Sequence, residues 1–145
     1  MMRALRVVLL WLLMALPSAH AWADIFVIVN AANPVRVLTS KETVDLFMGR
    51  TRVYANGDHV FACDLPRDST VRADFYRVMT GMSQAQINSY WARLMFTGQV
   101  MPPQAFGSEQ EILDVVKRNT GAIGYVSREP QDKNVRVVLF MKDGH

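Results

Sequence analysis

The residues of this chain best suited to chemistry lie at the start of a predicted helix near Ser69. Ser69 and Thr70 supply hydroxyl groups, and the backbone N–H groups of a first helical turn have no partners within the helix. Arg67 and Arg72 add positive charge on either side. Hydroxyl, free N–H and guanidinium groups together suit a phosphate or carboxylate ion. The segment is therefore a candidate anion-binding site.

The charge pattern distinguishes this helix from the other predicted helices. Those begin with capping boxes, in which Ser or Thr is followed three residues later by Glu or Gln: Thr39 with Glu42, Ser83 with Gln86, and Ser108 with Glu111. Arg72 takes that position here, and a cation in a first turn opposes the helix dipole unless an anion is near. In the alternative interpretation, Asp68 caps the helix and pairs with Arg72. The sequence leaves both interpretations open.

The remaining reactive side chains have no second residue at the sequence spacing that a metal site or a catalytic pair requires. His59 has no neighbouring His, Cys or paired carboxylate, which favours a structural role over a metal site. Cys63 is the single cysteine and lies in an apolar run, so we expect a buried thiol and no internal disulfide. Asp64 and Asp68 are expected to be solvated turn residues. Because no nucleophile has a recognisable histidine partner or elbow motif, we expect a protein that is not an enzyme and uses no cofactor.

The first 23 residues predict a signal peptide for export. Two arginines precede an apolar run at 7–16, and small residues follow it. A membrane-spanning helix needs about 20 apolar residues, twice the length of this run. Cleavage after Ala21 or after Ala23 fits the pattern, and a chain starting at Asp24 keeps 14 basic and 13 acidic side chains. We therefore expect a periplasmic protein that neither inserts in the membrane nor binds nucleic acid.

The mature part of the chain, residues 24–145, predicts one α/β domain with a buried core. Three apolar runs are expected to form strands of one buried sheet, at 25–29, 122–126 and 135–140. The last run is almost continuously apolar, which is typical of a strand covered on both faces. Asn56-Gly57 lies between the short runs 52–54 and 59–61, a pattern that predicts a β-hairpin.

Helices are expected between these strands, because apolar residues recur there at intervals of three and four. The expected helices are 40–48, one starting near Ser69 with a stripe through Val71, Phe75, Val78, Met79 and Met82, one with a stripe through Ile87, Tyr90, Trp91, Leu94 and Met95, and 108–118. Gly49 and Gly121 follow the first and last of these, where a left-handed residue commonly ends a helix. Pro102-Pro103 predicts an extended connection.

Short motifs spread over about 100 residues occur in a characteristic order. They are Asn33-Pro-Val, Leu38-Thr with Leu46-Phe-Met-Gly49, Asn56-Gly57, Ser69-Thr70 with Phe75, Tyr90-Trp91, Phe96-Thr-Gly98 and Gly121-Ala-Ile-Gly-Tyr-Val126. This order resembles that of the phosphate-binding proteins of phosphate ABC transporters, and Gly-Ala-Ile-Gly-Tyr is its most telling part. The resemblance implies a type II periplasmic-binding-protein fold, with a mixed sheet that carries helices on both faces.

The resemblance also has implications for function. Full-length members of the family have two lobes that close around phosphate, whereas this chain has room for one. In the family a Ser-Gly-Thr at a helix start holds phosphate, and Asp68-Ser69-Thr70 takes that place here without the glycine. The implied function is an exported solute-binding module for phosphate or a similar oxyanion, related to ABC transporter phosphate uptake. With the two arginines of the charge analysis, the candidate ligand residues are Ser69, Thr70, Arg72 and Arg67.

A second function stays open at this point. A single lobe without its closing partner can expose the former cleft to another protein, such as a membrane sensor or a transporter component. The chain would then be a periplasmic interaction or sensory accessory domain with a vestigial ligand site. Exposed side chains at Tyr90 or Trp91 would favour this alternative, because exposed aromatic residues mark contact surfaces.

Overall fold

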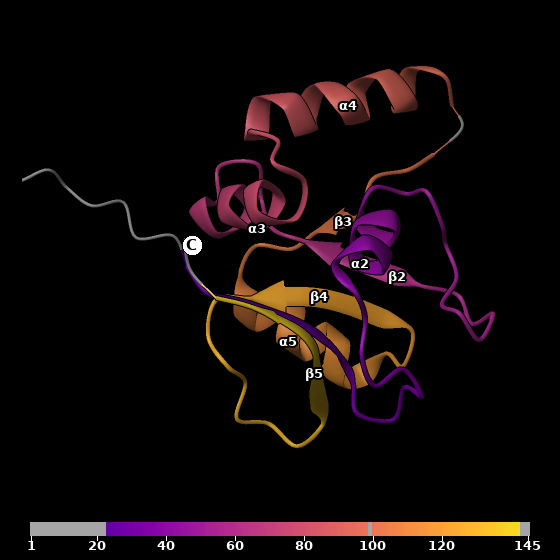
Figure 1. Cartoon of the computed structure of the whole chain (residues 1–145), viewed down its shortest axis with the longest axis vertical. Helices are drawn as coiled ribbons and strands as arrows, with labels where there is room; N and C mark the ends of the chain where they lie inside the picture. The colour runs from indigo at the N-terminus through magenta and orange to yellow at the C-terminus, as the bar shows by residue number, and fades with distance from the viewer. Residues whose placement is uncertain (1–22, 99, 143–145) are drawn as a thin grey trace, which may run out of the picture.

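A mixed β-sheet of five strands forms the centre of the computed structural model, which describes residues 23–98 and 100–142. The elements are β1 Ile25–Asn30, α2 Ser40–Phe47, β2 Phe61–Asp64, α3 Thr70–Thr80, α4 Gln84–Phe96, β3 Gln104–Ala105, α5 Glu109–Arg118, β4 Ala122–Val126 and β5 Val135–Met141. The strand order is β3-β2-β4-β1-β5 (Figure 1). β1 is antiparallel to β4 and β5, whereas β2 is parallel to β4 and β3. The three predicted sheet runs are therefore neighbours, as expected.

Helices cover both faces of this sheet, and alternate residues of β4 show how. The Tyr125 ring stacks on Phe75 of α3 at a centroid distance of 3.9 Å, and Phe47 of α2 meets it edge-on. Gly124 points to the opposite face, where a Cβ atom would lie only 2.4 Å from Ile112 of α5. Figure 1 shows α5 on one side of the sheet and α2 and α3 on the other. The predicted α/β architecture is confirmed.

One prediction for the strands is wrong. Phe140 of β5 is half exposed where it stacks on Phe26 of β1, so this strand is not fully covered on both faces. The predicted small hairpin is confirmed: Val53 and His59 form an antiparallel bridge. Beside this bridge, the Tyr54 N–H donates to the Asp58 carbonyl and the Val60 N–H donates to the Arg52 carbonyl, both at 2.9 Å. Residues 61–64 then pair with β4 and β3.

The predicted capping boxes form at the helix starts with one exception, at α5. Ser108 accepts the backbone N–H of Glu111, but the Glu111 carboxylate accepts the N–H of Gly107 instead of closing back on Ser108. The capping boxes of α2 and α4 are complete. In α3 the buried residues are Arg72, Phe75 and Tyr76, so an arginine and a tyrosine take places that the predicted stripe gave to aliphatic residues.

Helix α4 packs on α3 and lies beyond it when viewed from the sheet (Figure 1). Ile87 and Trp91 are buried, whereas Met95 of the same predicted stripe is 48% exposed. Trp91 lies against Gly49, whose φ of +70° closes α2 as its position predicts. Helix α4 is therefore an outer helix that packs on α3 and has no direct place on the sheet.

Candidate anion-binding site

The first turn of α3 has free hydrogen-bond donors. The Ser69 Oγ caps the helix by accepting the Arg72 N–H at 3.2 Å, and the Ser69 carbonyl accepts the N–H of Ala73. Asp68 does not cap the helix, so that part of the alternative interpretation is wrong. Within residues 23–98 and 100–142, no acceptor binds the N–H groups of Thr70 and Val71 or the Thr70 hydroxyl. These groups remain available to a ligand.

The start of α5 lies at the same surface depression. Its lining comes from the two segments that lead into α3 and α5: Leu65, Pro66, Asp68, Ser69, Thr70 and Val71 from one, and Gly107, Ser108 and Glu109 from the other. The depression has a volume of about 460 Å³. Because the N-terminal end of a helix carries partial positive charge, two such ends at one depression favour an anion there.

Two carboxylates also reach this depression. The Glu109 side chain accepts hydrogen bonds from the backbone N–H and the hydroxyl of Ser127, which joins the start of α5 to the residue after β4. Asp68 is exposed on the turn before α3. A carboxylate repels a fully ionised anion but accepts a hydrogen bond from an oxyanion that carries a proton. The depression therefore suits a protonated oxyanion better than one without a proton.

Arg72 is the third residue of α3, and only 5% of it is exposed. Its Nε donates to Asp64 Oδ2 at 3.3 Å, and its Nη1 donates to Gln84 Oε1 at 2.6 Å and to Asn88 Oδ1 at 3.3 Å. The pairing with Asp68 considered above is thus replaced by one with Asp64. Among the described residues, no acceptor binds the Arg72 Nη2 group. Arg72 joins β2, α3 and α4 and keeps one donor group unused.

Asp64 is the buried centre of this network, not the solvated turn residue that its sequence context suggested. Its carboxylate accepts the Leu65 N–H at 2.8 Å, the Tyr76 hydroxyl at 2.7 Å and the Tyr125 hydroxyl, besides Arg72. Burial, followed by the negative charge of Asp64, raises the pKa of both tyrosines well above the usual value. Both hydroxyls therefore stay protonated and donate to Asp64 across the neutral pH range.

The predicted site residues thus occupy different positions. Ser69 and Thr70 line the depression, whereas Arg72 is buried against Asp64 and Arg67 is exposed, both outside the lining. Sequence reasoning missed Gln84, the first residue of α4, whose amide also donates to the Ser69 carbonyl at 3.1 Å. It missed Asp64 as well, although a polar residue at the carboxyl end of a buried strand is a usable signal.

The Cys63 thiol and the aromatic residues Tyr90 and Trp91 of α4 are buried or already bonded. Burial, with a smaller effect of the Asp64 charge, raises the pKa of the Cys63 thiol to about 12, so the thiol is protonated and buried as predicted. No cluster of three or more potential metal ligands occurs in the described part of the chain. Trp91 is 3% exposed, and the half-buried Tyr90 donates its hydroxyl to the Met48 carbonyl at 2.7 Å. The exposed aromatic surface that would favour an interaction domain is therefore not formed by these two residues.

The predicted signal peptide lies outside the described residues, apart from Ala23. Within the described part, none of the helices has the length and apolar character required to cross a bilayer.

Comparison with known proteins finds similarity in structure only. No family model matches the sequence, and no curated protein does. A Clostridium perfringens structure with bound phosphate, described as a phosphate ABC transporter substrate-binding protein, aligns with a TM-score of 0.64 and 20% identity over 81% of this chain and 46% of that one. An ABC-type phosphate transport receptor from Vibrio cholerae aligns with a TM-score of 0.62 and 21% identity over 81% of this chain and 47% of that one.

The chain spans about half the length of these two structures. At 20–21% identity the likeness shows the fold. The chain therefore has the α/β fold of phosphate-binding substrate-binding proteins over a single lobe.

Proposed function

We propose that this chain is an exported solute-binding module that binds phosphate or a similar oxyanion, and that it acts in phosphate uptake with a membrane ABC transporter. The observation that carries the proposal is the meeting of two helix starts, those of α3 and α5, at one depression with unused donors. The structural neighbours support it, because they are described as phosphate binding or transport proteins.

Each predicted ligand residue has a role in this proposal. Ser69 accepts the Arg72 N–H through a lone pair and still has its hydroxyl hydrogen to donate. Thr70 donates its N–H and its hydroxyl, and Val71 donates its N–H. Arg72, buried in the first turn of α3 and paired with Asp64, adds positive charge near the helix start. Arg67 is exposed on the preceding turn, where its charge raises the local potential for an incoming anion.

Asp68 is expected to make the site selective. Its carboxylate lines the depression, and at neutral pH phosphate still carries a proton that sulfate lacks. A protonated oxyanion can donate that proton to Asp68, whereas sulfate would bring two acceptors together. We therefore expect phosphate to bind more tightly than sulfate, and the ligand to be released unchanged because the module is not an enzyme.

The replacement Thr70→Pro tests the site without breaking the helix. Proline is well tolerated at the first helical position, and Ser69 before it has the extended backbone that proline requires, with φ of −67° and ψ of 127°. The variant loses the Thr70 N–H and hydroxyl. Ser40→Pro is the matched control, because Ser40 is the first residue of α2 and follows the extended cap Thr39.

Thermal unfolding with and without phosphate provides the measurement. A bound ligand at 100 times its dissociation constant stabilises the native protein by about 2.7 kcal/mol. We expect that stabilisation in the wild type and in the Ser40→Pro variant, and its loss in the Thr70→Pro variant with little change in ligand-free stability. No stabilisation of the wild type by millimolar phosphate, or an undiminished one in the Thr70→Pro variant, would contradict the proposal.

A further inference from the structure

Helix α4 has one side that no other described element covers. Four exposed residues recur along that side at helical spacing, and we call them the outer face of α4: Ala85, Ser89, Ala92 and Phe96. At 3.6 residues per turn they fall within a sector of about 60°. In Figure 1 α4 forms one end of the molecule, and none of the described elements lies beyond it. The outer face is therefore open to a partner.

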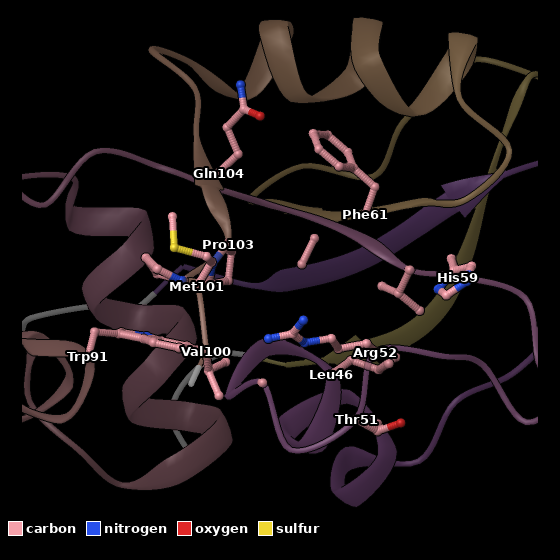
Figure 2. A pocket seen from close by; sticks show the side chains of 14 residues that line it. Leu46, Thr51, Arg52, His59, Phe61, Trp91, Val100, Met101, Pro103 and Gln104 are labelled. Carbon is pink, nitrogen blue, oxygen red and sulfur yellow. The ribbon is translucent and has the colours of Figure 1, made fainter. Parts of the chain in front are cut away.

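The inner side of α4 is occupied by the protein's own packing. It carries Ile87 and Trp91, the buried residues of the helix, and α4 packs on α3. Figure 2 shows Trp91 beside a hollow of about 570 Å³ at the start of β2, with Val100 and Met101 from the connection after α4. None of the four outer-face residues lines this hollow. The outer face is thus separate from both hollows of the sheet.

Large apolar side chains are exposed where α4 ends. Phe96 is 95% exposed, the neighbouring Met95 is 48% exposed, and Met101 of the following connection is 75% exposed. Single exposed apolar residues are common on protein surfaces, but a group of them marks a contact surface. Aromatic residues, Met and Arg are also the residue types enriched in protein–protein interfaces. The end of α4 therefore has the composition of an interface.

The charge pattern indicates which partner fits. Charged residues make up 20% of the whole chain, whereas residues 83–108 contain a single one, Arg93. Arg93 is exposed and follows Ala92 at the flank of the outer face. Two copies of such a surface can meet with little repulsion between like charges, and the surface offers few groups to a strongly charged partner. The outer face is therefore suited to contact with a second copy of the chain.

The order of large and small residues fits that second copy in an antiparallel orientation. A twofold interface brings one residue of the first copy to a different residue of the second, and the reverse contact also forms. When two α4 helices pair about a point midway between Ser89 and Ala92, Phe96 of each copy lies opposite Ala85 of the other. The phenyl ring then packs over a residue that has only a methyl group. A parallel pair would instead place the two Phe96 rings against each other.

We propose that the outer face of α4 is a dimer interface, on which a second copy of this chain packs antiparallel with Phe96 over Ala85. Helix α4 has 13 residues and is about 20 Å long. A contact of one such helix is at the small end of specific interfaces, so we expect a weak dimer that dissociates on dilution. Phosphate is not needed for this contact, because no outer-face residue lines the depression at the start of α3.

Sedimentation equilibrium of the natively secreted and processed protein, in phosphate-free buffer, measures the dimer. Phe96→Lys removes the ring and brings charge into the contact, so it should raise the dissociation constant by about tenfold or more. Val37→Lys is the matched control, since Val37 is 76% exposed and lies before α2, outside the outer face. It should leave the dissociation constant unchanged. Circular dichroism verifies that each variant is folded.

Cysteine cross-linking tests the antiparallel register. Ala85 and Phe96 lie about 16 Å apart along one helix, whereas a disulfide needs Cα atoms within about 7 Å, so the two positions cannot be joined within one chain. A protein with both Ala85→Cys and Phe96→Cys should therefore form a covalent dimer on oxidation, and either single variant should not. The native Cys63 thiol is buried and does not compete.

Several results would overturn the proposed dimer. They are a monomeric wild type at millimolar concentration, equal effects of Phe96→Lys and Val37→Lys, or cross-linking of the Phe96→Cys variant alone, which would indicate a parallel contact. Binding of a monomeric wild type to phosphatidylcholine vesicles, lost in the Phe96→Lys variant, would assign the outer face to a lipid surface instead. Stabilisation by phosphate is expected in the wild type and in the Phe96→Lys variant alike, so its absence would contradict the anion site and not the dimer.

Discussion

At the residue scale, the buried pair of Arg72 and Asp64 links the candidate anion site to the core. Both side chains are almost fully buried, and the Asp64 carboxylate accepts donors from Leu65 directly after β2, from α3 and from β4. A buried charge is costly without a partner, whereas an intact pair with its hydrogen bonds is tolerated. The pair therefore positions the start of α3 rigidly over the sheet, and each member depends on the other.

Replacing Arg72 by Met is expected to destabilise the protein by about 3–5 kcal/mol, because it leaves the Asp64 carboxylate buried without its cation. Urea denaturation measures the change. Arg50→Met is the control, since Arg50 pairs with Asp45 at the exposed surface and should contribute little. An equally small loss in both variants would show that the buried pair does not support the fold.

The Cys63 thiol predicts a pH dependence above neutrality. Folding raises its pKa from 9.0 to about 12, so at high pH the unfolded chain releases this proton while the native protein retains it. The contribution to stability is fully present below pH 9 and is lost as the pH rises from 9 to 12, by about 1.4 kcal/mol for each pH unit. Stability of a Cys63→Ala variant should fall less steeply over that interval. Parallel slopes in denaturant titrations of the two proteins would rule this out.

At the element scale, the packing of α5 on β4 decides how close the helical layer lies to the sheet. Gly124 is buried beneath α5, and its missing side chain makes room for Ile112 and Val116. The contact also places the start of α5 beside the start of α3, because the Glu109 carboxylate binds Ser127 directly after β4. The convergence of the two helix starts is thus a consequence of helix-on-sheet packing.

The change Gly124→Ala should destabilise the protein by about 1–3 kcal/mol, since the added methyl group would lie 2.4 Å from Ile112 Cγ2. Combining it with Ile112→Ala removes the clash. The double variant should then lose less stability than the sum of the two single changes. Thermal unfolding of all four proteins measures this, and strictly additive losses would contradict the proposed contact.

At the scale of the whole molecule, one mixed sheet carries two hollows at opposite ends of β2. The hollow at the end of the strand has carboxylates and free N–H groups, whereas the one at its start has an apolar wall with an arginine. The chain spans about half the length of its structural neighbours, so the anion site at the start of α3 is proposed for this lobe alone.

The export prediction also belongs to the whole molecule. A basic start, an apolar run of ten residues and small residues before Asp24 are expected to direct cleavage after Ala21 or Ala23. Mass spectrometry of the natively secreted protein should find Trp22 or Asp24 at the start. Recovery of a form that begins with Met1 in the membrane fraction would disprove it.

The sequence by itself determined the features that depend on near neighbours. The runs at 25–29 and 122–126 are strands, and the capping boxes at Thr39 and Ser83 start helices, because apolar periodicity and helix caps act over a few residues. Ser69 and Thr70 were identifiable for the same reason, since a helix start has free N–H groups wherever it lies.

Only the tertiary structure decided which distant segments meet. It pairs β2 with β4, leaves β5 at the edge, and buries Asp64 with an arginine that the sequence had offered to Asp68 or to a ligand. It also brings the starts of α3 and α5 to one depression. These outcomes depend on the balance of burial, charge pairing and packing across the whole chain, and local spacing carries no information about that balance.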